Sequence, residues 1–535
     1  MVDLFRNYSP IESLPGIEGE AAFMRIVRLC TGILICIWSV MARAEVKPNQ
    51  LFSDHAVLQS GMTLPVWGTA DPGEKVTVTL GKRKQSTITK TDGRWMVKLG
   101  KMAPGGPFAM TIAGKNVVTV NDVLIGEDWI GTGQSNMAFT ISVKAAKFAG
   151  MLDEEKEIAA ANYSQLRVFM VASKKSRDPE SEIQGEWKIA TPENAPAFSA
   201  VAYLFGRNLN QALKEPVGMV VVAFGGSTAE SWISRPVIAA DPEMAPMLTR
   251  FDDLFNFYKA HPGATTDQAP AAPQTINARP SKPGPLHDPV QDQHQPTVLY
   301  NGMVHPIIPF AMRGVIWYQG ESIVGGKAGV TLYPHVMEAL VKDWRAEWGE
   351  GNFPFYCVQL PPLKNVSNNP IVREGQAKLL SLPNTGMAVT LDVGDPTNVH
   401  PKDKEPVADR LSRIALNNVY GKKVEFSGPV FAGAKVDGAN IVVSFTHADG
   451  LSGKGGPLQW FQVAGADGKY FDATATVQGR TVVVHSSEVS ASAFVRYAWD
   501  NYPQGANLVN EAGLPAAPFR TDSQDILDDL LGLQR

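Results

Sequence analysis

Residues 123–137 run Val123-Leu124-Ile125-Gly126-Glu127-Asp128-Trp129-Ile130-Gly131-Thr132-Gly133-Gln134-Ser135-Asn136-Met137. The apolar residues predict a strand, and the small residues after them predict a tight turn that carries Ser135. A nucleophilic serine hydroxyl is usually placed in this way, at the carboxyl end of a strand with backbone N–H groups around it. Such a serine needs a base and oxyanion donors from elsewhere in the chain.

Length and composition indicate a globular protein of several domains. The chain has 535 residues, which is too long for one core and enough for two or three domains. Hydrophobic residues make up 44% of the chain and charged residues 19%, as in soluble globular proteins. The formal net charge is -4, so nothing indicates a polyanionic partner, and we predict no binding to nucleic acid.

The N-terminal residues have the pattern of a secretory signal peptide. A basic start at Met24-Arg25-Ile26-Val27-Arg28 precedes an apolar run over 29–40 and a cleavage site at Ala42-Arg43-Ala44. The run is too short to span a bilayer comfortably, and an uncleaved anchor is the alternative. We therefore predict that 1–44 is an extension plus signal peptide. The mature protein would then be periplasmic or secreted, without stable membrane association.

The cysteines are consistent with this prediction. Cys30 and Cys36 lie inside the predicted signal peptide, which leaves Cys357 alone in the mature chain. An intrachain disulfide framework and a cysteine metal site are then excluded. Cys357 lies in a strand-like run at 355–360, which predicts a buried core thiol.

The chain divides into two β-rich regions around an α/β centre. Residues 45–120 and 424–535 show short strands broken by turns, which predicts β-sandwich-type regions. Residues 121–423 alternate buried strand-like runs with helical spacing, which predicts a parallel sheet covered by helices. The clearest predicted strands are 218–224, 313–318 and 387–391, and the clearest helices are 198–213 and 332–348.

A long stretch without periodicity interrupts the α/β centre. Residues 259–296 are rich in Pro, Ala, Gln, Asp and Thr. A loop of this length in a domain is disordered or functional. It is either a rim of the active site or a surface insertion.

Polar residues follow strands at four places in the α/β centre. Ligand sites of parallel sheets form outside the carboxyl ends of strands, so we expect these blocks to converge. They are Gly133-Gln134-Ser135-Asn136-Met137, Phe224-Gly225-Gly226-Ser227-Thr228-Ala229-Glu230-Ser231-Trp232, Trp317-Tyr318-Gln319-Gly320-Glu321-Ser322 and Leu391-Asp392-Val393-Gly394-Asp395-Pro396-Thr397-Asn398-Val399-His400-Pro401. Taken singly, each block also fits a structural role: a glycine pair can be a plain turn, and a lone histidine can serve the core.

Together the blocks resemble the SGNH hydrolase superfamily, and more closely its sialate O-acetylesterase and acetylxylan-esterase-like family. The same resemblance includes Leu299-Tyr300-Asn301-Gly302-Met303 and the closing run 513–521, and it covers about 51–521. It implies an SGNH (flavodoxin-like) three-layer domain at 121–423, flanked by the two β regions. It also implies a serine carbohydrate O-acetylesterase.

The resemblance assigns catalytic roles by position. Ser135 corresponds to the nucleophile and His400 to its general base. The oxyanion donors would be the N–H of Ser135, an N–H of Gly225 or Gly226, and the side chain of Gln319, which stands where many SGNH enzymes have asparagine.

The catalytic acid departs from the family pattern. The aspartate usually found three residues before the histidine is replaced by Thr397, and the next residue is Asn398. Either a carbonyl orients His400 in a dyad, or Asp392 or Asp395 reaches it from the preceding loop. We select Asp395 as the candidate acid.

The same blocks supply the candidate substrate contacts, which are Asn136, Glu230, Trp232, Glu321 and His305. His305 precedes Pro306 where a smaller apolar residue is common in the family, and a structural role is its alternative.

The sequence thus predicts a secreted esterase that hydrolyses acetyl esters on sugars through an acyl-enzyme. The serine supplies the nucleophile, so we expect no metal or organic cofactor. The substrate would be acetylated xylan or another acetylated glycan fragment, with a sialate-specific enzyme as the alternative. A non-catalytic carbohydrate-binding protein on a hydrolase scaffold is the competing class, with Trp460 as a candidate glycan contact against its alternative as a core aromatic.

Overall fold

One long strand, β8 (Val117–Gly133), joins the N-terminal β region to the α/β centre. Its first half pairs antiparallel with β7 (Gly105–Ala113), while its second half runs parallel between β11 (Val217–Ala223) and β12 (Gly314–Tyr318). The strand therefore passes through the predicted boundary at residue 120, and the division into domains stays a prediction.

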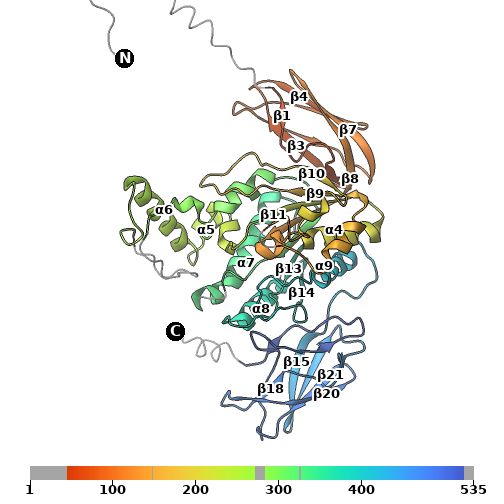
Figure 1. Ribbon diagram of the computed structural model, residues 1–535, viewed down its shortest axis with the longest axis vertical. Coiled ribbons are helices and arrows are strands. Elements are labelled where there is room, and N and C mark those ends of the chain that lie inside the picture. The colour runs from red at the N-terminus through yellow and green to blue at the C-terminus, as the bar shows by residue number, and fades with distance from the viewer. Residues whose placement is uncertain (1–44, 147–148, 271–283, 324–326, 523–535) are drawn as a thin grey trace, which may run out of the picture.

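The computed structural model describes residues 45–146, 149–270, 284–323 and 327–522. Figure 1 shows the β-rich N-terminal part at one end, the α/β centre in the middle and the C-terminal β part at the other end. The predicted signal peptide at 1–44 lies outside the described residues. Within these described ranges, no helix is long and apolar enough to cross a membrane.

The N-terminal part owes its strands to alternation of apolar and polar residues. In β3, β4 and β6 every second residue is buried, as expected for strands with one face on a core. β1, β3 and β6 form one sheet, and β2, β4, β5 and β7 connect to β8. The bounds are β1 (Lys47–Pro48), β2 (Val57–Gln59), β3 (Leu64–Thr69), β4 (Lys75–Leu80), β5 (Arg83–Ile88) and β6 (Arg94–Leu99).

The central sheet has the strand order β10-β9-β11-β8-β12-β13-β14. All neighbouring pairs are parallel except β10 with β9. Each residue of β12 and β13 is buried, because helices cover both faces of the sheet. The remaining bounds are β9 (Tyr163–Met170), β10 (Trp187–Ala190), β13 (Phe355–Val358) and β14 (Thr385–Ala388).

Two pairs of helices enclose this sheet. Apolar residues of α4 and α9 pack with Trp129, Ile316 and Tyr356 on one face, whereas those of α7 and α8 pack with Trp317 and Phe355 on the other. The predicted helices at 198–213 and 332–348 are confirmed as α4 and α7. The bounds are α4 (Ala200–Leu213), α7 (Lys327–Trp348), α8 (Asn369–Lys378) and α9 (Glu405–Asn418).

In the described part of the chain, ten further helical elements connect these strands and helices. They are α2 (Ser135–Ala138), α3 (Glu154–Ala160), η1 (Ala195–Ala197), η2 (Ala229–Trp232), α5 (Arg235–Ala240), α6 (Ala245–Ala260), η3 (Pro289–Gln291), η4 (Tyr300–Val304), η5 (His305–Ile307) and η6 (Leu379–Ser381). The predicted loop at 259–296 therefore begins at the end of α6 and includes η3, while its middle, 271–283, lies outside the described residues.

Cys357 lies in β13 and is 2% exposed, which confirms the predicted core thiol. Burial raises the pKa of this thiol to about 12, so it stays protonated and inert at neutral pH.

The C-terminal part contains two four-stranded sheets, ordered β15-β16-β21-β20 and β19-β18-β22-β24, and the small pair β17-β23. Trp460 is partly buried against their shared core and donates its indole N–H to the Gln504 carbonyl oxygen at 2.7 Å, as a core aromatic does. The bounds are β15 (Val430–Asp437), β16 (Asn440–Thr446), β17 (Ser452–Gly453), β18 (Phe461–Ala464), β19 (Tyr470–Asp472), β20 (Thr474–Gln478), β21 (Thr481–His485), β22 (Phe494–Tyr497), β23 (Leu508–Val509) and β24 (Phe519–Arg520).

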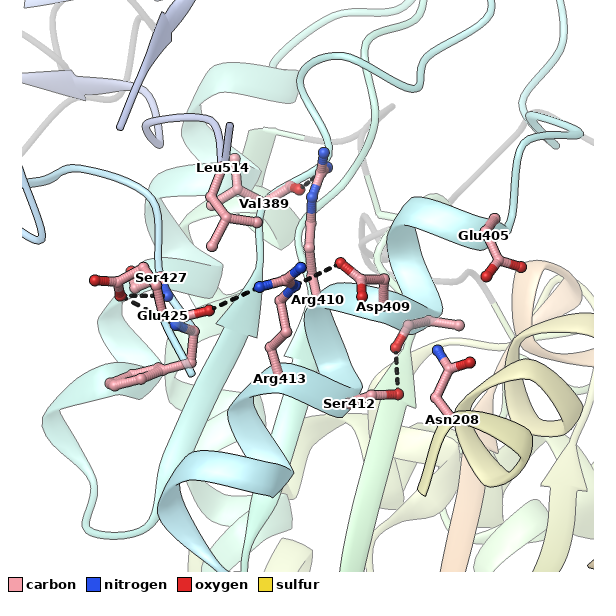
Figure 2. Close-up of polar contacts among 12 residues, drawn as sticks. Asn208, Val389, Glu405, Asp409, Arg410, Ser412, Arg413, Glu425, Ser427 and Leu514 are labelled. Carbon is pink, nitrogen blue, oxygen red and sulfur yellow. Dashed lines mark hydrogen bonds and ion pairs between the residues drawn. The ribbon is translucent and has the colours of Figure 1, made fainter. Parts of the chain in front are cut away.

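Arginines connect the α/β centre to this C-terminal part. On α9, Arg413 pairs with Asp409 and donates to the Glu425 carbonyl oxygen (Figure 2). On α8, the fully buried Arg373 donates to three carbonyl oxygens, those of Leu360, Asp500 and Asn501, at 2.8, 2.8 and 3.0 Å. Arg373 therefore joins α8 directly to the loop after β22.

Replacing Arg373 tests this connection. Arg373→Met leaves three buried carbonyl groups without their donor, so we expect a loss of about 1–3 kcal/mol in the free energy of unfolding. Arg413→Met removes a partly exposed pair on α9 and is the matched control, with an expected loss below about 1 kcal/mol. Thermal melting of the three proteins measures both, and equal melting temperatures for wild type and Arg373→Met would contradict the assignment.

Candidate active site

The candidate nucleophile lies at the end of the central strand of the sheet. β8 ends at Gly133, and Ser135 begins the short helix α2 after one intervening residue. Gly133 has a φ of 131°, and a Cβ at this position would lie 2.2 Å from the Tyr318 carbonyl oxygen of the neighbouring strand. Only glycine fits this turn, which brings the Ser135 hydroxyl to the carboxyl edge of the sheet.

The loop after β14 brings His400 to this serine. The Nε2 atom of His400 lies 2.7 Å from Ser135 Oγ, within hydrogen-bonding distance. Two contacts define the place of His400 in its loop: its backbone N–H donates to Asn398 Oδ1 at 2.9 Å, and its ring stacks on Phe139. The sequence-predicted pair of nucleophile and base is thus brought together.

The site keeps this imidazole neutral. Burial, and after it the nearby Lys404 ammonium, lowers the pKa of His400 from 6.5 to about 4. A neutral imidazole can accept a proton from the serine hydroxyl as the hydroxyl attacks a carbonyl carbon.

Gly225, one of the predicted oxyanion donors, lies beside the serine. A Cβ on Gly225 would be 3.7 Å from the Cβ of Ser135, and Gly226 has a φ of 71°, in the left-handed region. Among the described residues, the N–H groups of Ser135, Gly225 and Gly226 donate to no other backbone group. They remain available for a developing oxyanion, and their role stays a prediction.

Gln319 is completely buried behind this site. Its Nε2 donates to the Ser227 carbonyl oxygen at 3.1 Å, and its Oε1 accepts from the Tyr333 hydroxyl at 3.0 Å. These contacts fix the amide plane next to the glycine loop. Its role as an oxyanion donor also stays a prediction.

Both candidate acids hydrogen-bond to groups of the described chain other than His400. Asp395 accepts hydrogen bonds from the backbone N–H groups of Thr397 and Asn398, both at 2.8 Å, and so holds the turn before His400. Asp392 forms a two-point ion pair with Arg410, with both N–O distances at 2.7 Å. Figure 2 shows Arg410 on α9, where it also donates to the Val389 carbonyl oxygen. Asp395 as the acid remains a prediction.

Three of the predicted substrate contacts have protein partners instead. Trp232 is completely buried and donates its indole N–H to Ser227 Oγ at 3.0 Å. Asn136 is equally buried, and its amide contacts Glu321, Val399 and Lys404. Contact of Asn136, Glu321 or Trp232 with substrate is therefore a prediction for which this geometry gives no support.

Of the remaining predicted substrate contacts, Glu230 has a carboxyl oxygen that is unpaired among the described residues, whereas His305 is hydrogen-bonded to the backbone. Glu230 is 6% exposed, and its Oε2 is buried with no hydrogen-bond partner in the described part of the chain. Burial raises the pKa of this carboxyl. The ring of His305 is 2.7 Å from the Glu180 carbonyl oxygen, which fits the structural alternative.

Two residues of the 259–296 loop, Gln293 and His294, lie near the glycine pair without having been predicted as site residues. A Cβ on Gly226 would lie 3.5 Å from Gln293 Nε2, and the ring of His294 is 2.7 Å from Asp292 Oδ1. The hydrogen bond to Asp292, and a further one to the backbone of Gly226, raise the pKa of His294. Part of this loop therefore borders the glycine pair, as the rim alternative predicted, but no residue pattern singled out His294.

Comparisons with known proteins identify the class. A family model described as carbohydrate esterase, sialic acid-specific acetylesterase, matches residues 290–409. A carbohydrate acetylesterase from Xanthomonas citri has 34% sequence identity and a TM-score of 0.76, and the match covers 90% of this chain and 100% of that one. The protein is a carboxylic ester hydrolase that acts on acetylated carbohydrate.

The sequence relatives agree with this class. Sialate O-acetylesterase of Mus musculus is 29% identical over 517 residues, which cover 85% of this chain and 90% of the relative. The Homo sapiens enzyme of the same name is 28% identical over 516 residues, covering 85% and 88%. The chain belongs to the carbohydrate acetylesterase family that includes the sialate O-acetylesterases, which confirms the resemblance given by its motifs.

The low pKa of His400 predicts a pH profile. The base must be neutral to act, so kcat/KM is expected to stay level from neutral pH to about pH 5 and to fall about tenfold per unit below the pKa. Initial rates with 4-nitrophenyl acetate between pH 3 and 8 (about one reading per half unit) measure this limb. A decline centred at 6.5, the ordinary histidine value, would contradict the buried, cation-flanked setting of His400.

Proposed function

We propose that the protein releases acetate from sugar hydroxyls through an acetyl-enzyme on Ser135, with His400 as the base. The observation that carries this proposal is the distance of 2.7 Å between Ser135 Oγ and His400 Nε2, at the carboxyl end of the central strand. Contact between the two side chains also argues against a non-catalytic binding protein on a hydrolase scaffold.

The proposed reaction has two half-reactions that balance. Ser135 Oγ bonds to the acetyl carbon while its proton moves to His400 Nε2, and the carbonyl oxygen becomes an oxyanion among the N–H groups of Ser135, Gly225 and Gly226. Collapse breaks the bond to the sugar oxygen, which takes the proton from His400. Water then repeats the sequence on the acetyl-enzyme, and acetate leaves with Ser135 restored.

The domain architecture and the cellular location are part of the same proposal. The α/β centre is an SGNH-type domain flanked by two β-sandwich regions, which the sheet order and the two flanking β parts support. The basic, apolar and small-residue pattern before Glu45 supports export to the periplasm or the medium.

Acetylated xylan or similar glycan fragments are the proposed substrate, as expected from the sequence. The sialate alternative is favoured by a different observation, since the family model and the mammalian relatives carry that substrate in their descriptions. Neither Glu230 nor His294, which hydrogen-bonds to the backbone of Gly226, distinguishes a neutral sugar from a sialic acid.

Removal of either proposed catalytic side chain tests the mechanism. Ser135→Ala and His400→Ala are each expected to lower kcat for 4-nitrophenyl acetate at least about a thousandfold, because the two groups act as a unit. Ser412→Ala, which removes a buried hydroxyl on α9 (Figure 2), and His447→Ala, in the C-terminal part, are the matched controls and should retain activity. Equal activity of all five proteins would contradict the proposal.

Acetate release tests the substrate. Purified enzyme is given acetylated xylo-oligosaccharides or 9-O-acetyl sialic acid at equal acetyl concentration, and kcat/KM is compared. We expect the higher value with the xylo-oligosaccharides. A strong preference for the sialic acid would replace the proposed substrate by the alternative and would leave the mechanism standing.

A further inference from the structure

The residue after the nucleophile contacts the residue before the base. Asn136, next to Ser135, donates from its side-chain Nδ2 to the carbonyl oxygen of Val399 at 3.0 Å. Val399 directly precedes His400. One amide thus links the two loops at positions adjacent to both reacting side chains.

A buried lysine fixes the direction of that amide. Lys404 is 0% exposed, and its Nζ donates to Asn136 Oδ1 at 2.5 Å. Nδ2 of Asn136 also donates to the Glu321 carboxylate. An ammonium group only donates and a carboxylate accepts, so the amide oxygen faces Lys404 and the amide nitrogen faces Val399 and Glu321.

Aromatic rings complete the surroundings of this ammonium group. Nζ of Lys404 lies 4.6 Å from the ring centroid of Phe139 and 5.4 Å from that of Tyr318, within the range of cation–π attraction. Phe139 in turn stacks on the ring of His400. The lysine is therefore packed into the site itself, with two aromatic rings within reach of its ammonium group.

Charged groups from two loops act on Lys404 and His400. Glu321, from the loop after β12, and Asp403, from the loop before α9, oppose the effect of burial, which lowers the pKa of Lys404 to about 7. For His400, Lys404 is the charged group whose field acts with burial to lower the pKa. Lys404 thus keeps a positive charge in mildly acidic solution, where a histidine would otherwise become protonated.

We propose that Lys404 is a positioning residue of the esterase site. Through the amide of Asn136 it holds the turn of Ser135 against the loop of His400, and its charge acts together with burial to disfavour protonation of His400. This inference rests on the proposed function, because it concerns the same nucleophile and base. It goes further by assigning a device that extends the activity to low pH.

Two substitutions separate the charge from the hydrogen bond. Lys404→Gln keeps a donor for Asn136 and removes the charge, while Lys404→Met removes both. In both variants we expect the acid limb of kcat/KM for 4-nitrophenyl acetate to move up by as much as about one pH unit, because the charge of Lys404 is the smaller of the two causes that lower the pKa of His400. Only Lys404→Met is expected to lose also about tenfold to a hundredfold in kcat at neutral pH with little change in KM.

Lys402→Met is the matched control. Lys402 is an exposed lysine of the same loop, two residues from His400, and should leave both the limb and kcat as in wild type. Asn136→Ala tests the hydrogen-bonding role: kcat should fall, while the acid limb of kcat/KM moves much less than in Lys404→Gln. Thermal melting of each variant identifies any protein that fails to fold, and Lys404→Gln keeps the test open if Lys404→Met does not fold.

The outcomes separate this inference from the proposed function. A folded Lys404→Gln variant whose acid limb coincides with that of wild type would overturn the role of Lys404, while inactive Ser135→Ala and His400→Ala variants would leave the esterase mechanism intact. A limb that moves equally in Lys402→Met would also overturn it, because the effect would then be general to the loop. Full activity of Ser135→Ala would instead refute the proposed function.

Discussion

The hydrogen bond between Ser135 Oγ and His400 Nε2 joins two side chains that are 265 residues apart in the sequence. Its length leaves little room for movement, so both loops must end at fixed places on the same edge of the sheet. β8 supplies one end, since parallel neighbours on both sides hold it in register up to Gly133. The loop from β14 to α9 supplies the other. The hydrogen bond from Asn136 to the Val399 carbonyl oxygen joins the two loops next to Ser135 and His400.

The packing behind the site serves the same need, which is to hold the reacting side chains at fixed places. Gln319 is fixed by Ser227 and Tyr333, and Trp232 by Ser227, so the glycine loop rests on buried polar contacts. Buried polar groups that are fully paired rigidify a site, whereas unpaired ones are costly. Thr228 Oγ1, Glu230 Oε2 and Glu321 Oε2 are exceptions, because each is buried without a hydrogen-bond partner among the described residues.

The sequence predicted those features that local chemistry determines. The apolar run before Ser135, the buried strands of the centre and the helices α4 and α7 follow from periodicity, and the motifs after the strands led to the family. Of the predicted site, the Ser135–His400 pairing is observed, while the roles of Asp395, which holds its own loop, and of Asn136, which contacts protein groups, stay predictions. Periodicity carries no signal for the direction of a buried amide or for a lysine such as Lys404, because both depend on contacts between distant loops. The continuity of β8 across residue 120 was hidden for a similar reason, since its partners change from β7 to β11 and β12 within one strand.

The claim that Ser135 is activated by His400 is tested most directly by covalent labelling. Diethyl 4-nitrophenyl phosphate transfers its diethylphosphoryl group to an activated serine and releases 4-nitrophenolate, and peptide mass spectrometry locates the modified residue. The account predicts one labelled position, Ser135, in the wild type and almost no labelling in His400→Ala. Labelling at another serine, or equal labelling of Ser135 in the two proteins, would contradict it.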